Sequence, residues 1–240
     1  MLVIPKQTSI FKEGESLIEF LHAHLEPLAD ASIIVIASKV VALSQARVVH
    51  EWDAQTKDAL IKKSSDVVLH SSVVPLTLTQ GVFMAAAGID ESNAQGTLIL
   101  TPRDAYGVAD EIRRVMLKKY NLRKLGVLII DSTPMPLRKG VTAITLGYAG
   151  FDGIFSYKGK KDLFGRRFKY SEASHADMLA AAAMLVMGEG SEQKPLAVIT
   201  EAPVKFSTKR VNPKSLRMNP RDDIYSSLYP KQLFKKKAST

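Results

Sequence analysis

The sequence predicts an α+β fold of mixed sheets with packed helices, followed by an extended basic C-terminal arm. Short continuous apolar runs are typical of buried strands, and amphipathic or alanine-rich stretches between them are typical of helices. The expected strands and helices alternate without the regular spacing of about 30 residues that repeated strand–helix–strand units produce. After Pro203 both patterns give way to a polar, basic segment. We therefore expect one domain over residues 1–203 and an arm over residues 204–240.

The apolar runs predict the strands. Ser32–Ala37 and Gly126–Ile130 are the clearest, because their unbroken aliphatic composition is typical of strands buried on both faces. The expected strands, in chain order, are Leu2–Ile4, Ser32–Ala37, Arg47–Val49, Val67–Val74, Gly81–Ala85, Gly96–Leu100, Gly126–Ile130 and Leu196–Ile199.

Two amphipathic segments predict helices in the first half of the chain. Glu15–Leu25 places its aliphatic side chains on one face. The second helix is expected to start near Thr101, a hydroxyl N-cap followed by Pro102 at the first helical position, and to run to about Tyr120.

An alanine-rich segment predicts a third helix over Glu172–Met187, ended by Gly188. A capping box that begins at Ser174 is the alternative start, and it would shorten the helix by two or three residues.

Composition and charge limit the classes of function. The 240 residues contain no cysteine, so a metal would need oxygen or imidazole ligands. Residues 204–240 hold ten Lys or Arg and two Asp, which is +8 of the net charge of +9. The rest of the chain is close to neutral, so we expect nucleic acid binding only through the arm, if at all. A solubilising extension is the simpler interpretation of that arm.

No apolar run approaches the roughly 20 residues that span a bilayer. The first residues also lack the basic and apolar segments of a secretion signal. We expect a cytoplasmic protein with no membrane partner.

The arm contains one apolar stretch. Because Ile224, Tyr225, Leu228 and Tyr229 are too apolar for a free tail, we expect Asp222–Tyr229 to dock on the body, or on a second subunit, near the site described below. The lysines at residues 235–237 are expected to stay solvated.

Familiar phosphate and metal motifs are absent, but two segments place an acid after an apolar strand. Asp90 follows an apolar strand that starts at Gly81 and ends on Gly88, and Asp131 ends the Gly126–Ile130 run beside Ser132. Carboxylates and a hydroxyl at strand ends suit Mg²⁺ or Mn²⁺ that also binds nucleotide phosphates. Taken singly, each Asp is also typical of a turn or a helix cap.

Five segments occur together in one order: GVFMAAAGIDESN, LGVLIIDST, GYAGF, a K-G-x-x-D-x-F-G-R segment and the alanine-rich helix ending VMGEG. In this combination the chain, from about Ile4 to Thr200, resembles the coenzyme F420-0:L-glutamate ligase family. The resemblance implies the fold of that family and a homodimer. It also implies a GTP- and divalent-metal-dependent enzyme that adds glutamate to a carboxylate through an acyl-phosphate.

The resemblance also implies roles for residues at matching positions. Those for metal binding are Asp90, Asp131, Ser132 and Glu189. Those for nucleotide binding are Ser38, Lys39, Asn93, Gly188, Gly190 and Ser191. Lys39 and Arg138 are the candidate catalytic cations, which would stabilise the transferred phosphoryl group or the acceptor carboxylate.

The chain departs from the family where a substrate would bind. Thr133–Leu137 replaces a segment that in the family usually includes Arg and Trp. Leu43 and Gln45 stand where a Lys and a Glu are usual, and Ala86 stands where an Asn is usual. We therefore expect GTP or ATP with Mg²⁺ or Mn²⁺ to be kept, while the carboxylate acceptor, a small molecule or a peptide, need not be F420.

Three hypotheses for function remain open from the sequence. The first is a ligase that joins an amino acid, expected to be L-glutamate, to such an acceptor. The second is a non-catalytic, regulatory nucleotide-binding homologue, since Leu43 and Gln45 remove two charged groups. The third is a scaffold whose basic arm binds RNA.

Overall fold

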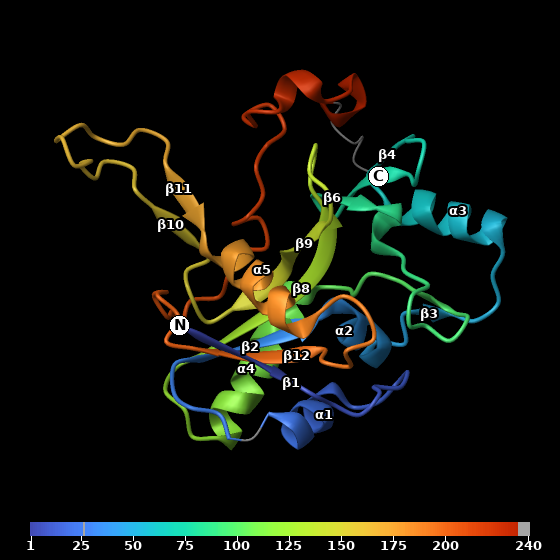
Figure 1. The fold of residues 1–240 in the computed structure, drawn as a ribbon, viewed down its shortest axis with the longest axis horizontal. Coiled ribbons are helices and arrows are strands. Elements are labelled where there is room, and N and C mark those ends of the chain that lie inside the picture. The colour runs from blue at the N-terminus through green and yellow to red at the C-terminus, as the bar shows by residue number, and fades with distance from the viewer. Residues whose placement is uncertain (26, 235–240) are drawn as a thin grey trace.

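The computed structural model describes residues 1–25 and 27–234, and its mixed helices and sheets confirm the expected α+β class. A central sheet has the strand order β1-β12-β2-β8-β9 (Figure 1). Its strands β2 and β8 are parallel, whereas the other neighbours pair antiparallel. The bounds are β1 Leu2–Lys6, β2 Ser32–Ala37, β8 Leu125–Pro134, β9 Val141–Ala149 and β12 Leu196–Thr200.

Helices cover both faces of this sheet. One face packs against α1 (Leu17–His24), α2 (Ser38–Ser44) and α4 (Ala105–Lys119), and the other packs against α5 (His175–Met187). Alternate residues of β2 serve the two faces, since Ile34 and Ile36 join the first core and Ile33 and Val35 join the second. A strand buried on both sides must be apolar at every position, which explains the unbroken run.

A smaller lobe is inserted between α2 and α4. It contains a three-stranded antiparallel sheet, a two-stranded pair, one helix and a 3₁₀ turn, around a core that includes Ile61, Ala87 and Leu98. Its elements are β3 Val48–Val49, α3 Ala54–Ser64, β4 Val67–Leu69, β5 Leu76–Thr79, β6 Val82–Ala85, η1 Ala86–Gly88 and β7 Leu98–Ile99.

A two-stranded hairpin projects from the body just before α5 (Figure 1). Its strands are β10 (Ile154–Ser156) and β11 (Glu172–Ser174), and they pair antiparallel. Two further 3₁₀ turns, η2 (Ser226–Leu228) and η3 (Lys231–Phe234), lie in the arm.

The expected start of the second helix was wrong. α4 begins at Ala105, and the Asp104 carboxylate caps it by accepting the backbone N–H of Gly107 at 3.0 Å. Thr101 cannot serve as the cap because it is buried and its carbonyl accepts the Arg47 side chain. A tertiary contact therefore holds this segment extended past Pro102.

At the third helix the alternative start is confirmed. Ser174 is the N-cap of α5, and its hydroxyl accepts the backbone N–H of Asp177 while donating to the Asp177 carboxylate. The residues before it, Glu172–Ser174, belong instead to β11.

Several strand limits differ from expectation. The expected strand Val67–Val74 ends early, because β4 stops at Leu69 and residues 70–75 form the turn that leads to β5. β8 does not end at Asp131 but continues to Pro134, since it pairs along its whole outer half with β9. The sequence analysis missed β5, β9, β10 and β11, together with α2 and α3.

The arm packs on the body closer to its start than expected. Val204, Phe206, Val211 and Leu216 lie against the core under α5. Within Asp222–Tyr229, Tyr229 contacts Phe83 with ring centroids 5.5 Å apart, whereas the other three apolar side chains are exposed. The lysines at residues 235–237 lie outside the described residues. The division at residue 203 stays a prediction.

No helix in the described ranges is long and apolar enough to cross a membrane.

The packing of the arm predicts that truncation position matters. A chain that ends at Val204 loses Phe206, Val211 and Leu216, and should lose about 3 kcal/mol or more of unfolding free energy in urea titrations. A chain that ends at Pro230 keeps these contacts and should match the full-length protein. Equal stability of all three chains would contradict this packing.

A second prediction concerns Gly150, where the arm, α4 and β8 meet. A Cβ at Gly150 would collide with the Leu125 carbonyl oxygen and the Arg113 side chain. Gly150→Ala should cost about 2–4 kcal/mol. Gly159 is the control, because it has a similar positive φ (+79°) but open space around it, so Gly159→Ala should cost about 1 kcal/mol. Comparable losses, measured by urea unfolding, would argue against the close contact.

Candidate functional site

The parallel pairing of β2 and β8 builds the floor of the site. Ala37 pairs with Ile130, so the next residues, Ser38 and Asp131, come together at the carboxyl ends of both strands. Ser38 is buried and hydrogen-bonds the Asp131 carboxylate. Ligand sites in sheets of this kind commonly lie at carboxyl ends of parallel strands.

The smaller lobe brings Asp90 over this floor through a strained turn. Ala86, Ala87 and Gly88 all have positive φ, and the hydroxyl of buried Thr77 accepts the Ala87 backbone N–H at 3.0 Å. Two backbone hydrogen bonds between Asp90 and Ile99 then hold the acid in place. Non-glycine residues at positive φ cost about 1 kcal/mol each, and such strain collects at functional sites.

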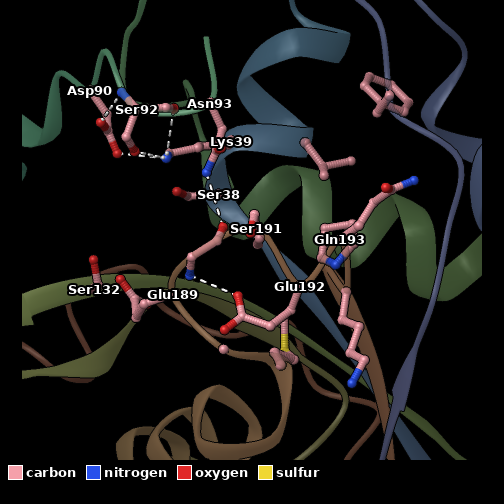
Figure 2. A pocket seen from close by; sticks show the side chains of 18 of the residues that line it. Ser38, Lys39, Asp90, Ser92, Asn93, Ser132, Glu189, Ser191, Glu192 and Gln193 are labelled. Atoms are coloured by element: carbon pink, nitrogen blue, oxygen red, sulfur yellow. Dashed lines mark hydrogen bonds and ion pairs between the residues drawn. The ribbon is translucent and has the colours of Figure 1, made fainter.

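Lys39 joins the two halves of the site. Its ammonium lies 2.6 Å from Asp90 Oδ2 and donates to Ser92 Oγ at 2.8 Å (Figure 2). The backbone N–H of Ser92 donates to Asp90 Oδ1 at 2.7 Å. The first turn of α2 is therefore tied to the loop that carries Asp90.

The loop after α5 closes the opposite side. Asn93 Nδ2 donates to the Gly190 carbonyl at 3.1 Å, and the Gly190 N–H donates to Glu192 at 2.8 Å (Figure 2). Gly188 leaves the helix with φ +84°, where a Cβ would collide with the Glu192 carboxylate. Gln193 and Thr8 exchange two hydrogen bonds that connect this loop to the end of β1.

These elements enclose a cavity of about 530 Å³, a volume ordinary for a small-molecule site. Polar groups predominate at the end formed by Asp90 and Asp131, and apolar side chains such as Phe11 and Leu43 line other parts of its wall. In Figure 2, Ser132 and Glu189 lie apart from the Lys39 cluster, near the lower wall.

The two aspartates sit in different electrostatic surroundings. Burial raises the pKa of Asp131 to about 6, and the nearby Asp90 charge acts in the same direction, against a hydrogen bond from Ser38. Burial also acts to raise the pKa of Asp90, but hydrogen bonds from Lys39 and Ser92 and the Lys39 charge hold it below its ordinary value. The Asp131 carboxylate is thus the less compensated of the two.

Comparison with known proteins identifies the family. The family described as F420-0:Gamma-glutamyl ligase matches residues 6–201. The chain belongs to this ligase family. It is 33% identical over 217 residues to the coenzyme F420:L-glutamate ligase of Methanococcus maripaludis strain C6, covering 83% of this chain and 86% of that protein. It is 31% identical over 224 residues to the enzyme of that name from Methanocaldococcus jannaschii, covering 85% and 89%.

The structure brings together the candidate site residues named from the sequence, with one exception. Arg138 lies in the turn between β8 and β9, where its N–H donates to the Met135 carbonyl, and it does not line the cavity. The candidates that do line it are Ser38, Lys39, Asp90, Asn93, Asp131, Ser132, Gly188, Glu189, Gly190 and Ser191.

Other cavity residues were missed by the sequence analysis. Ser92 binds Lys39 and Asp90, and the segment Thr8–Phe11 forms one wall together with Gln193 and Lys194. A run of polar residues after the first strand was the available signal, but nothing local showed that it faces the loop after α5.

We predict that Lys39 sets the pKa of Asp90. In Lys39→Met the ammonium is gone while the burial remains, so the pKa of Asp90 should rise. Carboxyl ¹³C NMR titration of the metal-free protein measures it. Lys158→Met removes a lysine paired with Glu172 on the distant hairpin and should leave the Asp90 titration unchanged. An unshifted Asp90 in Lys39→Met would contradict the ion pair.

Proposed function

We propose that this protein is a γ-glutamyl ligase that joins the amino group of L-glutamate to a carboxylate of an acceptor. GTP or ATP supplies the phosphoryl group, and Mg²⁺ or Mn²⁺ binds with the nucleotide. The observation that carries the proposal is the single cavity in which Asp90, Asp131 and Lys39 face the glycine-containing loop after α5. Membership of the ligase family supports the reaction class.

The donor set fits a hard divalent cation. Among its lining residues, Asp90, Asp131, Ser132 and Glu189 offer oxygen atoms, and neither cysteine nor histidine contributes. Within the described ranges no group of three or more His, Asp or Glu side chains is close enough to hold a metal by itself. Mg²⁺ is usually held by one or two carboxylates with phosphate oxygens and water, so a site completed by nucleotide phosphates matches this arrangement.

The poorly compensated Asp131 carboxylate also fits a cation. A buried carboxylate beside a second one is stabilised by nearby positive charge, and the Lys39 ammonium is bonded to Asp90. Asp90, Asp131, Ser132 and Glu189 would hold the metal, which would neutralise phosphate charge when bound.

The nucleotide would be held by groups of the chain on both sides of the cavity. Ser38 and Lys39 lie at one side, and the backbone of Gly188–Ser191 lies at the other. Asn93 fixes that loop through its bond to Gly190. Two glycines let the loop approach a ligand closely, because no side chain intervenes.

The reaction then proceeds in two steps, phosphoryl transfer to the acceptor followed by formation of the amide bond. An acceptor carboxylate oxygen attacks the γ-phosphorus, the bond to the β–γ bridging oxygen breaks, and nucleoside diphosphate leaves. The glutamate amine attacks the acyl carbon of the resulting acyl-phosphate, loses a proton and expels inorganic phosphate. Lys39 stabilises the negative charge on the transferred phosphoryl group.

The positions that depart from the family bear on the acceptor. Gln45 exchanges two hydrogen bonds with the backbone of Arg103, so its role is to hold the end of α2 against the segment before α4. Met135 and Leu137 are exposed at the turn between β8 and β9. Leu43, by contrast, lines the cavity itself. The aspartates and Lys39 are retained, which favours catalysis with an acceptor that need not be F420.

The test combines purified protein with GTP or ATP, Mn²⁺, L-glutamate and a panel of carboxylate acceptors that includes F420-0. Nucleoside diphosphate release that requires both glutamate and an acceptor, with a glutamyl adduct by mass spectrometry, is the expected result. Nucleotide binding without turnover would favour the regulatory homologue. Salt-sensitive RNA binding without nucleotide binding would favour the scaffold.

We predict that Asp131→Asn weakens Mn²⁺-dependent nucleotide binding by about 100-fold or more, because a charged ligand is lost at a partly buried position. Isothermal titration calorimetry measures the affinity, and circular dichroism checks the fold. Asp152→Asn is the control: this aspartate is outside the cavity, 3.7 Å from Lys205, and the same substitution there should leave affinity unchanged. Unchanged affinity in Asp131→Asn would show that the site is misplaced.

A further inference from the structure

The turn that carries Asp90 into the cavity is strained over three consecutive residues. Ala86, Ala87 and Gly88 have φ values of +48°, +59° and +68°, a left-handed run in which only the last residue is glycine. Both alanines are buried, so the strain lies inside the smaller lobe and not in a loose surface loop. Side chains at such φ values are disfavoured, and the surrounding structure must enforce the conformation.

The hydroxyl of Thr77, on the neighbouring strand β5, enforces this turn. The Thr77 side chain is 0% exposed, and its hydroxyl donates to the Met84 carbonyl at 2.9 Å and accepts the Ala87 N–H at 3.0 Å. The hydroxyl of Thr79, also buried, lies 3.0 Å from it. Because the single Thr77 hydroxyl proton is given to Met84, Thr79 donates to Thr77. The Thr77 hydroxyl is thus fully hydrogen-bonded, and two of its three bonds hold the backbone that leads into the turn.

The same turn also reaches the second aspartate of the site. A Cβ at Gly88 would lie 2.6 Å from Thr101 Cγ2 and 3.5 Å from Asp131 Oδ2, so the glycine backbone packs directly beside the Asp131 carboxylate. Two residues later the chain reaches Asp90, whose backbone exchanges two hydrogen bonds with Ile99. The conformation of this one turn therefore sets how the two carboxylates lie relative to each other.

Resting on the function proposed above, we propose that Thr77 is a positioning residue for the metal and nucleotide site. It acts through the left-handed turn Ala86–Gly88, which sets the separation of Asp90 and Asp131. Thr77 does not line the cavity, so it does not contact a ligand there. Its role is indirect: the hydroxyl fixes the turn, and the turn places the two carboxylates.

Loss of the Thr77 hydroxyl should release the turn without emptying the core. In Thr77→Val the Ala87 N–H and the Met84 carbonyl lose a buried partner, so the strained conformation loses its support. Relaxation of the turn displaces Asp90 relative to Asp131, which weakens the binding of a ligand that needs both carboxylates. Valine and threonine share the same branched shape, so the packing around position 77 is kept.

Calorimetric titration of the full chain with Mn²⁺ and GTP or ATP separates positioning from packing. Thr77→Val should bind about 10–100-fold more weakly than wild type, the range found for residues that support metal ligands. Thr77→Ser keeps the hydroxyl and should bind like wild type. Thr79→Val is the matched control: it removes an equally buried hydroxyl but leaves the two backbone hydrogen bonds of Thr77, so its affinity should be unchanged.

A second substitution tests whether the effect passes through the turn. Glycine adopts positive φ without strain, so Ala87→Gly added to Thr77→Val should recover most of the lost affinity. Equal weakening in Thr77→Val and Thr79→Val, or no recovery with Ala87→Gly, would assign Thr77 to packing and overturn the proposal.

Amide hydrogen exchange of the ligand-free chain gives a readout that does not depend on the proposed function. In Thr77→Val the Ala87 and Asp90 amides should exchange about tenfold faster or more relative to Ile34 of the central sheet, whereas Thr79→Val should keep the wild-type ratio. An unchanged Asp90 ratio in Thr77→Val would refute the positioning role. If wild type bound no nucleotide while the ratio changed as expected, the proposed function would fail and the control of the turn by Thr77 would stand.

Discussion

The parallel register of β2 and β8 is the constraint on which the site depends. Because Ala37 lies opposite Ile130 at the end of this pairing, the next residues, Ser38 and Asp131, lie side by side. A shift of one residue would send Asp131 to the opposite face of the sheet, since side chains alternate along a strand. The apolar residues before Asp131 are buried against helices on both faces, and this burial fixes the register.

Around that floor, ionic and hydrogen bonds connect segments that are distant in the chain. Lys39 binds the loop of Asp90 and Ser92, and Asn93 from that loop binds Gly190 after α5. The Lys39 contacts join helix α2 to the smaller lobe, and the Asn93 contact joins that lobe to the loop after α5. The cavity therefore exists only when all three are assembled, and any bound ligand would add to the contacts between them.

The two basic segments, the hairpin and the arm, both leave the body near Gly150. Ser207 donates to the Gly150 carbonyl, and Asp152 donates to the carbonyl of Lys205. The arm returns to cover the core under α5, whereas the hairpin leaves its aromatic residues exposed.

The sequence by itself determined the fold class, the buried strands Ser32–Ala37 and Gly126–Ile130, and the family. These depend on local signals: unbroken apolar runs, a Ser174 cap, and an acid directly after an aliphatic strand. Only the tertiary structure decided that α4 is capped by Asp104 and not by Thr101, because the Arg47 side chain donates a hydrogen bond to the Thr101 carbonyl. It also decided that Arg138 stands outside the cavity while Ser92 and Thr8 line it. The start of α4 and the lining of the cavity depend on contacts between segments that are distant in the sequence. A short polar loop has no local sequence pattern that predicts which distant segment it will contact.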